Sequence, residues 1–403
     1  MNTTQPLKGF RDFLPAEAAK RKWLRDKLAA ICESWGYLPV ETPTLEPLEI
    51  FTGAIGEDEK LFFKFKDQGD RDVALRYDQT VPTCRLIAEY QNSLTFPFKR
   101  YQIQPAFRAE KPQKGRYREF TQVDADIFGI KTPDADAETI ALSLDIYKQL
   151  GFKRPLVRIN TRALFKDIPY GAIVSIDKIK KIGGEGVLAE MNRKGISSDK
   201  AKEYLNYVKN LTPNEEITFI LKYLKDYGFP DDWYEFDPTI ARSFSYSMGP
   251  IWEVEIPEAG GLSVLGGERY DGLIEKLAGK DIGGTGFGLG FDRTLEAADA
   301  LGLTPTITTS GQILMTVFAV GSLPQALEIT RLLRSGGVYT DLYPAPDKLD
   351  KQLKYADRKG IPYVVIQGPD EAKRNVMKLK NMQTKEQEEL TVQQVIDKLT
   401  VAS

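Results

Sequence analysis

The sequence predicts an α+β protein in which strand hairpins alternate with helices, followed by a smaller α/β domain. Three observations carry this prediction. Residues 98–129 have the pattern of a long hairpin around a charged loop. Residues 166–235 read as short charged helices. From residue 312 onward, strands and helices alternate in β-α-β-α-β order, which is typical of a largely parallel sheet.

Composition is consistent with a globular protein of two or three domains. The chain has 403 residues, of which 42% are hydrophobic, enough to supply a core. No run approaches the roughly 18 apolar residues of a membrane span, and the N-terminal residues lack a signal pattern. Cys32 and Cys84 have no metal-like spacing. We therefore expect a reduced, cytoplasmic protein.

Charge and histidine content narrow the chemistry. The net charge is −2, so any contact with RNA must come from local basic patches. The chain contains no histidine, which excludes a Ser-His-Asp triad, a histidine base and a histidine-ligated metal. Phosphate activation by arginine and Mg²⁺ stays possible, because it depends on positioning and electrostatics. Drift in a histidine-poor lineage and deliberate recoding explain the absence equally well.

The N-terminal elements follow from apolar spacing and from glycine and proline positions. Residues 16–35 have helical periodicity, and Gly36 ends that helix. Residues 37–47 are predicted as a strand interrupted by prolines. A hairpin follows, with strands at 60–66 and 73–77. Thr80 is then expected to cap the next helix, with a proline in its first turn.

The hairpin at 98–129 carries the strongest chemical signal. Its strands are expected at 100–107 and 116–128, and arginines 108, 116 and 118 lie on or beside the loop at 110–115. The guanidinium fork matches phosphate oxygens two at a time, so this arrangement favours polyphosphate binding over an exposed, solvated hairpin. Gln122, Asp124 and Asp126 recur at period two, on one face of the second strand. They predict a second, polar ligand beside the nucleotide.

The remaining elements are predicted in order. Residues 134–150 form an amphipathic helix, and strands are expected at 251–256 and 262–265. Residues 283–302 then read as a small-residue strand that runs into a helix, with Arg293 at the junction. Close packing of sheet on helix also explains a glycine-rich strand, so the glycines alone are weak evidence. Residues 304–311 are a linker.

These segments resemble the three motifs of class II aminoacyl-tRNA synthetases. The N-terminal helix and strand with Pro43 resemble motif 1, the hairpin resembles motif 2, and the segment around Arg293 resembles motif 3. The ending GRYREF-x-Q-x-D-x-D-x-x-G is most similar to histidine–tRNA ligases. The resemblance covers nearly the whole chain.

The resemblance implies a domain organisation and a reaction. A catalytic domain with a mostly antiparallel sheet would comprise residues 1–165 and 236–303, with a helical insertion at 166–235. An anticodon-binding domain would follow at 312–403. The implied activity is ATP-dependent aminoacylation of tRNA, with histidine as the amino acid, through an aminoacyl-adenylate. Mg²⁺ would be held by ATP oxygens and water rather than by protein ligands. A homodimer and tRNA(His) as partner are implied as well.

Roles carried over from the family assign both ends of the site. Arg108 and Arg242 would be catalytic, each contacting the α-phosphate and the substrate carboxylate. Glu110 and Arg116 would hold adenine and phosphates, and Arg293 the γ-phosphate. Asp126 would accept a hydrogen bond from the imidazole. The other implied contacts of the amino acid are Asp78, Gln79, Thr80, Gln122, Tyr246, Ser247, Glu268 and Tyr270.

Two motifs depart from the family pattern around the substrate side chain. The family's R-G-L-D-Y-Y-T-G reads RSFSYSMG at 242–249, so that Ser247 replaces a tyrosine that touches the imidazole. The family's G-G-G-R-Y-D-G-L keeps all but one glycine, which is Glu268 here. A buried carboxylate is costly unless it is paired. Either the adjacent Arg269 or a cationic substrate is expected to pair with it.

Three hypotheses therefore stay open at this point. The chain is a histidine–tRNA ligase with a repacked pocket, a synthetase re-tuned to another amino acid, or a synthetase-like tRNA-binding or regulatory protein without activation activity. Arginines 108, 242 and 293 argue against the third hypothesis, because a non-catalytic protein has no physical need for all of them.

Overall fold

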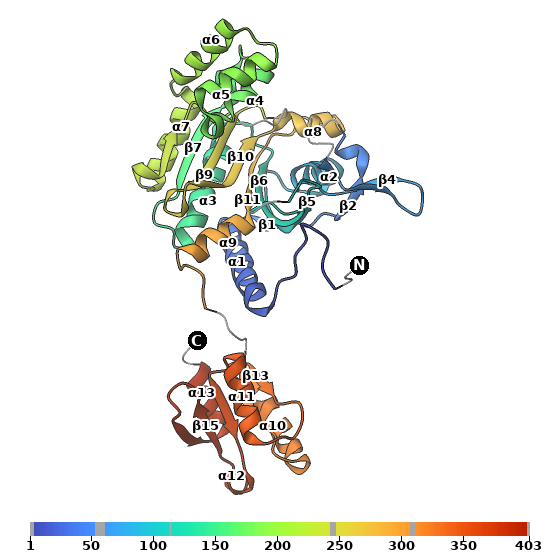
Figure 1. Ribbon diagram of the computed structural model, residues 1–403, viewed down its shortest axis with the longest axis vertical. Coiled ribbons are helices and arrows are strands. Elements are labelled where there is room, and N and C mark those ends of the chain that lie inside the picture. The colour runs from blue at the N-terminus through green and yellow to red at the C-terminus, as the bar shows by residue number, and fades with distance from the viewer. Residues whose placement is uncertain (1–3, 53–60, 113–114, 242–246, 307–310, 401–403) are drawn as a thin grey trace. The chain divides into compact units, whose positions relative to one another are not determined.

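The computed structural model describes residues 4–52, 61–112, 115–241, 247–306 and 311–400 (Figure 1). The chain divides into two compact units, one of residues 1–12 and 21–304 and the other of residues 13–20 and 305–403. None of the helices in the described ranges is long and apolar enough to cross a membrane.

The first unit is built on an eight-stranded sheet of order β1-β5-β6-β11-β10-β9-β7-β8. Only the outer pairs, β1 with β5 and β7 with β8, are parallel, so the prediction of a mostly antiparallel sheet is confirmed. The strands are β1 (Leu38–Pro39), β5 (Phe98–Phe107), β6 (Glu119–Phe128), β7 (Leu156–Thr161), β8 (Tyr234–Phe236), β9 (Pro250–Ile256), β10 (Leu262–Arg269) and β11 (Gly284–Gly290).

The predicted hairpin is formed by β5 and β6, which pair from Phe98 opposite Phe128 to Phe107 opposite Glu119. The second strand begins three residues later than predicted. The reason is that the loop is tied to another segment before the strand starts. The Arg118 N–H donates to the Gly9 carbonyl oxygen at 2.9 Å, and the Arg118 carbonyl accepts from the Arg108 N–H at 2.9 Å.

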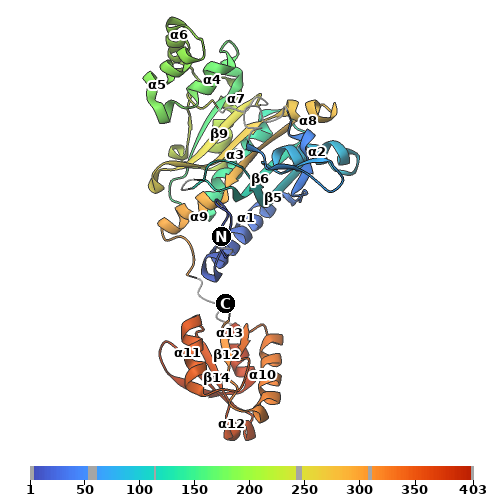
Figure 2. The same ribbon diagram turned by 45° about the vertical axis from the view of Figure 1, so that its right-hand side comes forward.

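Helices cover one face of this sheet and only part of the other. The large core joins the sheet to α1 (Pro15–Ser34), α3 (Pro133–Gln149), α7 (Glu215–Tyr227) and α9 (Phe291–Ala300). On the opposite face, α2 (Thr80–Tyr90) and α8 (Asp271–Ala278) share a smaller cluster with Phe128 and Tyr270, and they lie side by side in Figures 1 and 2. A cavity lined by β6, β10 and β11 opens on this second face.

A small sheet of order β2-β4-β3 lies before α2, from strands β2 (Leu45–Pro47), β3 (Lys64–Lys66) and β4 (Asp72–Leu75). It contains the predicted hairpin, with shorter strands. The prediction that Thr80 caps α2 is wrong, because Thr80 is already helical. The Asp78 carboxylate accepts a hydrogen bond from the Val81 N–H at 3.3 Å and satisfies that end of the helix instead.

The predicted helical insertion contains α4 (Tyr170–Ile176), α5 (Ile179–Arg193) and α6 (Ser198–Lys209), which share their own apolar cluster. The fourth helix, α7, packs differently. Its apolar residues Ile217, Ile220 and Leu224 are fully buried in the large core of the first unit. Packing therefore divides the stretch 166–235 between two apolar clusters.

The second unit has a five-stranded sheet of order β13-β12-β14-β15-β16. Its strands are β12 (Ile313–Met315), β13 (Thr340–Leu342), β14 (Tyr363–Ile366), β15 (Met377–Asn381) and β16 (Gln387–Leu390), and its helices are α10 (Leu323–Ser335), α11 (Leu349–Lys359), α12 (Pro369–Lys373) and α13 (Val392–Thr400). The first three strands are parallel, as predicted, but β14, β15 and β16 pair antiparallel. The short α12 is too brief a connection for a parallel crossover.

Candidate active site

A cavity of about 540 Å³ opens on the second face of the large sheet. Its floor is formed by β6, β10 and β11, and its walls by the β5–β6 loop, the start of α9 and the segment that leads into α2. Nine residues predicted for the site line it: Asp78, Thr80, Arg108, Glu110, Arg116, Gln122, Asp126, Glu268 and Tyr270. Arg293 is the tenth predicted residue that lines it.

The glycines of β11 make room for the side chains of the neighbouring strand. Residues 286 and 288 face the cavity, while Phe287 and Leu289 between them are buried in the core. A Cβ atom on Gly286 would lie 2.0 Å from Asp126 Oδ1, and one on Gly288 would lie 3.3 Å from Asp124 Oδ1. The glycine-rich strand therefore serves the site and not only the packing of sheet on helix.

One end of the cavity is cationic. Arg116 Nη1 lies 3.4 Å from Glu110 Oε2, and Arg293 Nη1 donates to the Ser263 carbonyl oxygen at 3.0 Å. The Arg108 guanidinium lies over the Tyr77 ring at 4.4 Å. Burial lowers the pKa of Arg293, and the charges of Arg116 and Arg108 lower it further. Three guanidinium groups line this end with two described carboxylates, Glu110 and Asp292, and Asp292 is paired with Arg11 and Arg21, so the end suits a polyphosphate.

Arg118, the third arginine of the predicted phosphate loop, has a different role. Its Nε donates to the Glu110 carbonyl oxygen at 3.0 Å, and Nη1 donates to the Lys8 carbonyl oxygen at 3.4 Å. It ties the loop to the N-terminal segment and does not line the cavity.

The sequence did not predict the ion pairs of Asp292 with Arg11 and Arg21, which lie next to the cationic end. Arg21 Nη1 and Arg11 Nη2 both contact Asp292 Oδ1, at 2.6 and 2.8 Å. Arg11 also lies 3.3 Å from the centre of the Tyr117 ring. These contacts connect the N-terminal segment, the hairpin loop and the start of α9. Because Arg21 and Asp292 are 271 residues apart, no local pattern could have indicated them.

The other end of the cavity is lined by carboxylates. Glu268 on β10 lies opposite Gly286 on β11, which in turn lies opposite Asp126 on β6. The Tyr270 hydroxyl donates to Asp126, and the Ser247 hydroxyl donates to Glu268. Both carboxylates are largely buried, with exposed fractions of 2% for Asp126 and 6% for Glu268.

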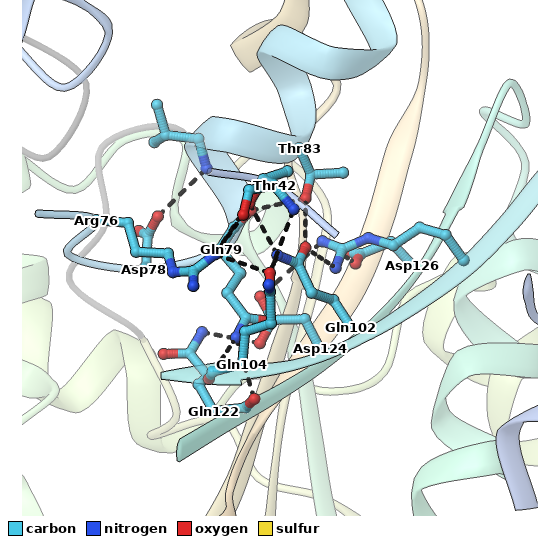
Figure 3. Close-up of polar contacts among 12 residues, drawn as sticks. Thr42, Arg76, Asp78, Gln79, Thr83, Gln102, Gln104, Gln122, Asp124 and Asp126 are labelled. Carbon is cyan, nitrogen blue, oxygen red and sulfur yellow. Dashed lines mark hydrogen bonds and ion pairs between the residues drawn. The ribbon is translucent and has the colours of Figure 1, made fainter. Parts of the chain in front are cut away.

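A buried polar layer lies behind the carboxylate end (Figure 3). Arg100 is fully buried, and its Nη2 lies 2.6 Å from Asp126 Oδ2 and 4.0 Å from Asp124 Oδ2. Its Nη1 donates to Gln102 Oε1 at 3.1 Å. The layer continues through Gln104 to Arg76, which donates to Gln104 Oε1 at 2.7 Å. This network fixes the position of Asp126 from the neighbouring strand β5, on the same face of the sheet.

Gln79 belongs to the same layer, and its predicted contact with the amino acid is not what the structure shows. The residue is fully buried, and its Nε2 donates to the carbonyl oxygens of Gln104 at 2.9 Å and Gln122 at 3.1 Å. It does not line the cavity, whereas its neighbours Asp78 and Thr80 do. Gln79 instead joins the start of α2 to the two strands of the hairpin.

Comparisons with known proteins identify the family. The profile of histidyl-tRNA synthetase matches residues 9–182, and that of the anticodon binding domain matches residues 313–401. The histidine–tRNA ligase of Cytophaga hutchinsonii is 34% identical, over 97% of this chain and 98% of the relative. The chain belongs to the histidyl-tRNA synthetase family. The histidine–tRNA ligase of Helicobacter pylori is also 34% identical, over 95% of this chain and 94% of its own.

Solved structures of the family share the fold. The histidyl-tRNA synthetase of Nostoc sp. PCC 7120 superimposes with a TM-score of 0.84 at 26% identity, and all of both chains is covered. The apo enzyme of Staphylococcus aureus gives a TM-score of 0.71 at 24% identity, over 98% of this chain and 99% of that one. The class II fold that the motifs predicted is thereby confirmed.

Ser247 and Glu268 are the two pocket residues that depart from the family pattern, and their contacts show how the pocket accommodates them. The expectation that Arg269 pairs with Glu268 is wrong. Neighbouring residues of a strand point to opposite faces, and Arg269 points away from the cavity. Its Nη2 lies 2.6 Å from Asp136 Oδ2, and its Nη1 lies 3.1 Å from Asp271 Oδ1. Arg269 is therefore paired with Asp136 and Asp271, on the side of the sheet opposite the cavity.

Two further described residues interact with Glu268. Ser247, which replaces the family's tyrosine, is buried and directs its hydroxyl to this carboxylate. Burial lowers the pKa of Arg162, and Glu268 is among the anions that raise it. Arg242 and Tyr246 of the same departed motif lie outside the described residues.

Asp124 and Asp126 share one buried cation, the Arg100 guanidinium. Burial raises the pKa of Asp124 to about 8, against the attraction of Arg100. Burial also raises the pKa of Asp126, and Arg100 and the Tyr270 hydroxyl oppose that shift. Asp126 lies closer to Arg100 than Asp124 does, so Arg100 stabilises a negative charge on Asp126 better than one on Asp124. Burial likewise raises the pKa of Asp78, which the Arg108 charge opposes.

Proposed function

We propose that this chain activates histidine with ATP and transfers it to tRNA. The observation that carries the proposal is a single cavity with guanidinium groups at one end and acceptor carboxylates at the other. Family membership supports the same reaction. A protein that only bound tRNA would have no use for a cavity of this composition on its sheet.

In the first step the histidine carboxylate attacks the α-phosphorus of ATP. A bond forms between a carboxylate oxygen and phosphorus, the bond to the β-phosphate oxygen breaks, and pyrophosphate leaves. Two anions approach each other in this step, which is unfavourable unless cations lie between them. We propose Arg108 for that role, and Arg116 and Arg293 for the β- and γ-phosphates, because all three guanidinium groups line the same end of the cavity. We assign Arg242 the contact that bridges the α-phosphate and the carboxylate.

The amino acid would lie with its side chain toward β10. Asp78 and Thr80 line the cavity where they can receive the ammonium group, and Gln122 lies beside them. Asp126 would accept a hydrogen bond from the ring. The Tyr270 hydroxyl and Arg100 hold that carboxylate in place.

Mg²⁺ would enter with the nucleotide. Among the described residues, no group of three acidic, cysteine or histidine side chains is arranged to hold a metal ion. These residues therefore fit an ion whose ligands are phosphate oxygens and water. When bound, the ion would offset phosphate charge alongside the arginines.

The second step would transfer the aminoacyl group to the terminal ribose of tRNA. The C-terminal unit matches the anticodon binding domain over residues 313–401, which supports tRNA as the partner. We propose that α4, α5 and α6 contact the acceptor arm, and that two copies of the chain pair through the segment around Pro43, as the motif 1 resemblance implies.

The test is ATP–pyrophosphate exchange with purified protein against the twenty amino acids. We expect exchange with histidine, and loss of exchange in Arg242→Ala with unchanged circular dichroism. Arg374→Ala serves as a control, because this arginine pairs with Glu389 on the surface of the second unit. Unchanged exchange in Arg242→Ala would remove the proposed mechanism. Absence of exchange with every amino acid, in protein that still binds ATP, would favour the non-catalytic alternative.

A further inference from the structure

We infer that Arg11 is a positioning residue of the ATP site, which holds the loop that carries Arg116 against the helix start that carries Arg293. The inference rests on the proposed function and deepens it, since it assigns the N-terminal segment, residues 8–11, to the binding of the β- and γ-phosphates. Arg11 itself does not line the cavity. It would therefore act through the neighbours of the two arginines that do.

The contacts of Arg11 reach the residue next to each of these arginines. Its Nη2 lies 2.8 Å from Asp292 Oδ1, and Asp292 immediately precedes Arg293. Its guanidinium lies 3.3 Å from the centre of the Tyr117 ring, and Tyr117 immediately follows Arg116. Tyr117 and Asp292 both line the cavity. One guanidinium group thus joins the loop to the helix start at the phosphate end of the cavity.

The rest of the N-terminal segment fixes the same loop. The Gly9 carbonyl oxygen accepts from the Arg118 N–H at 2.9 Å, and the Lys8 carbonyl oxygen accepts from Arg118 Nη1 at 3.4 Å. Gly9 has a φ of +92°, and a Cβ atom on it would lie 2.8 Å from Arg118 Cγ and 2.9 Å from Pro112 Cγ. The segment therefore approaches the loop more closely than a residue with a side chain allows.

Arg21 fixes the same carboxylate from α1. It is 9% exposed, its Nη1 lies 2.6 Å from Asp292 Oδ1, and its Nη2 donates to Thr121 Oγ1 at 3.0 Å. Arg11 therefore contacts a carboxylate that is already tied to α1 and, through it, to β6. The N-terminal brace consists of residues 8–11, Arg21, Tyr117, Arg118 and Asp292.

The repulsion between the phosphate arginines gives this brace a physical role. Burial lowers the pKa of Arg293, and the charges of Arg116 and Arg108 lower it further, so the three guanidinium groups disfavour one another's charge. Before ATP binds, this repulsion favours separation of the loop from the helix start. A contact that keeps them together reduces the reorganisation that binding requires, and so raises the affinity for a polyphosphate.

Calorimetry of nucleotide binding tests the inference. In Arg11→Met we expect the affinity for ATP to fall about tenfold, since the residue acts without contacting the ligand. The affinity for AMP should change less than about twofold, because AMP lacks the two outer phosphates. In pyrophosphate exchange, KM for ATP should rise by the same factor, with an unchanged KM for histidine. Arg11→Lys keeps the charge but not the planar fork, and should recover part of the loss.

Arg158→Met is the matched control. The Arg158 side chain is 23% exposed, as is that of Arg11, and its Nη2 lies 3.2 Å from Glu255 Oε2. In both variants the carboxylate that loses its partner keeps a second cation, which is Lys180 for Glu255. Arg158 also pairs with two further carboxylates, so its loss should cost at least as much stability. It lies on β7, outside the cavity lining, and we expect unchanged affinity for ATP.

A measurement on the natural chain applies if the Arg11 variants do not fold. If the brace and ATP favour the same arrangement, ATP must stabilise the brace in return. The Arg118 amide donates to Gly9 within the brace. Its hydrogen exchange should therefore slow at least about fivefold with ATP and change little with AMP.

The outcomes separate the inference from the proposed function. Equal loss of affinity for ATP and AMP in Arg11→Met, unchanged affinity for both, or the same loss in Arg158→Met would overturn the inference and leave the function intact. So would an Arg118 amide whose exchange ATP does not slow. Binding of ATP without exchange of any amino acid would overturn histidine activation, while the contrast between ATP and AMP would still decide the inference. Absence of ATP binding by the natural chain would overturn both.

Discussion

Replacing Gly286 with alanine tests whether the glycine strand shapes the site. The new Cβ atom would lie 2.0 Å from Asp126 Oδ1 and 2.5 Å from the Ala125 carbonyl oxygen. Neither distance is tolerable, and the second involves backbone, so Asp126 must move and the strands must separate locally. Such overpacking costs about 1–3 kcal/mol in a well-packed site. Movement of Asp126 would also lengthen its 2.6 Å contact with Arg100.

Gly288→Ala is the matched control, because Gly288 faces the same cavity two residues further along β11. Its Cβ atom would lie 3.3 Å from Asp124 Oδ1 and Gln122 Nε2, where a shift of a few tenths of an ångström suffices. We expect a cost below about 1 kcal/mol. The free energy of unfolding can be measured by urea titration with tryptophan fluorescence. All four tryptophans, at positions 23, 35, 233 and 252, lie in the first unit, so the signal reports that unit.

The two variants should also differ in catalysis. A displaced Asp126 would raise the KM for the amino acid by about tenfold, the equivalent of about 1.4 kcal/mol. The affinity for ATP should change little, because Arg108, Arg116 and Arg293 lie at the other end of the cavity. Equal stability and equal KM for the two variants would refute the idea that Gly286 makes the space that the Asp126 carboxylate occupies.

Three further predictions follow from the buried charges. Arg100→Met should destabilise the first unit by about 3–5 kcal/mol, because Asp126 loses its buried partner; adding Asp126→Asn should recover most of this in the same urea titration. Asp124 has a pKa of about 8 in the folded state, so the folded chain holds a proton that the unfolded chain releases above about pH 4. This carboxyl should therefore make stability fall between about pH 4 and 8 by up to about 1.4 kcal/mol per unit. Asp124→Asn should make the slope shallower in urea titrations across pH, while Asp136, whose pKa burial raises to about 6, keeps its own contribution. Arg293→Ala should weaken ATP binding by about tenfold or more in calorimetry, and an unchanged affinity would remove this residue from the phosphate site.

Much of the catalytic fold was predictable because its signals are local. The β5–β6 hairpin, α1, α3 and the β11–α9 junction follow from periodicity, glycines and prolines over short stretches. The antiparallel half of the second sheet was not predicted, since a short helix between two strands gives no local sign of the direction in which the chain returns. The ion pair of Arg21 with Asp292 joins segments that only the fold brings together.

The error about Arg269 has a more specific cause. The strand was predicted to end at residue 265. Residues 266–273 were therefore not assigned to either face of the sheet. In the structure β10 continues to Arg269. Alternation then assigns Glu268 and Tyr270 to the cavity and Arg269 to the core side. The prediction that Gln79 contacts the amino acid was wrong for a related reason. Its neighbours Asp78 and Thr80 line the cavity, but the sequence did not show which side chains of this short segment face the cavity and which face the sheet.

The two departures from the family pattern are best understood as one exchange. Ser247 and Glu268 are 21 residues apart in sequence, yet the hydroxyl of one donates to the carboxylate of the other. Replacing a tyrosine by serine removes bulk and a phenol from the pocket, while replacing a glycine by glutamate adds bulk and an acceptor. Either change alone would leave a gap or a carboxylate without this donor. Together they exchange a neutral hydroxyl that reaches the ligand for an anion. A pocket altered in this way keeps its size more closely than its charge.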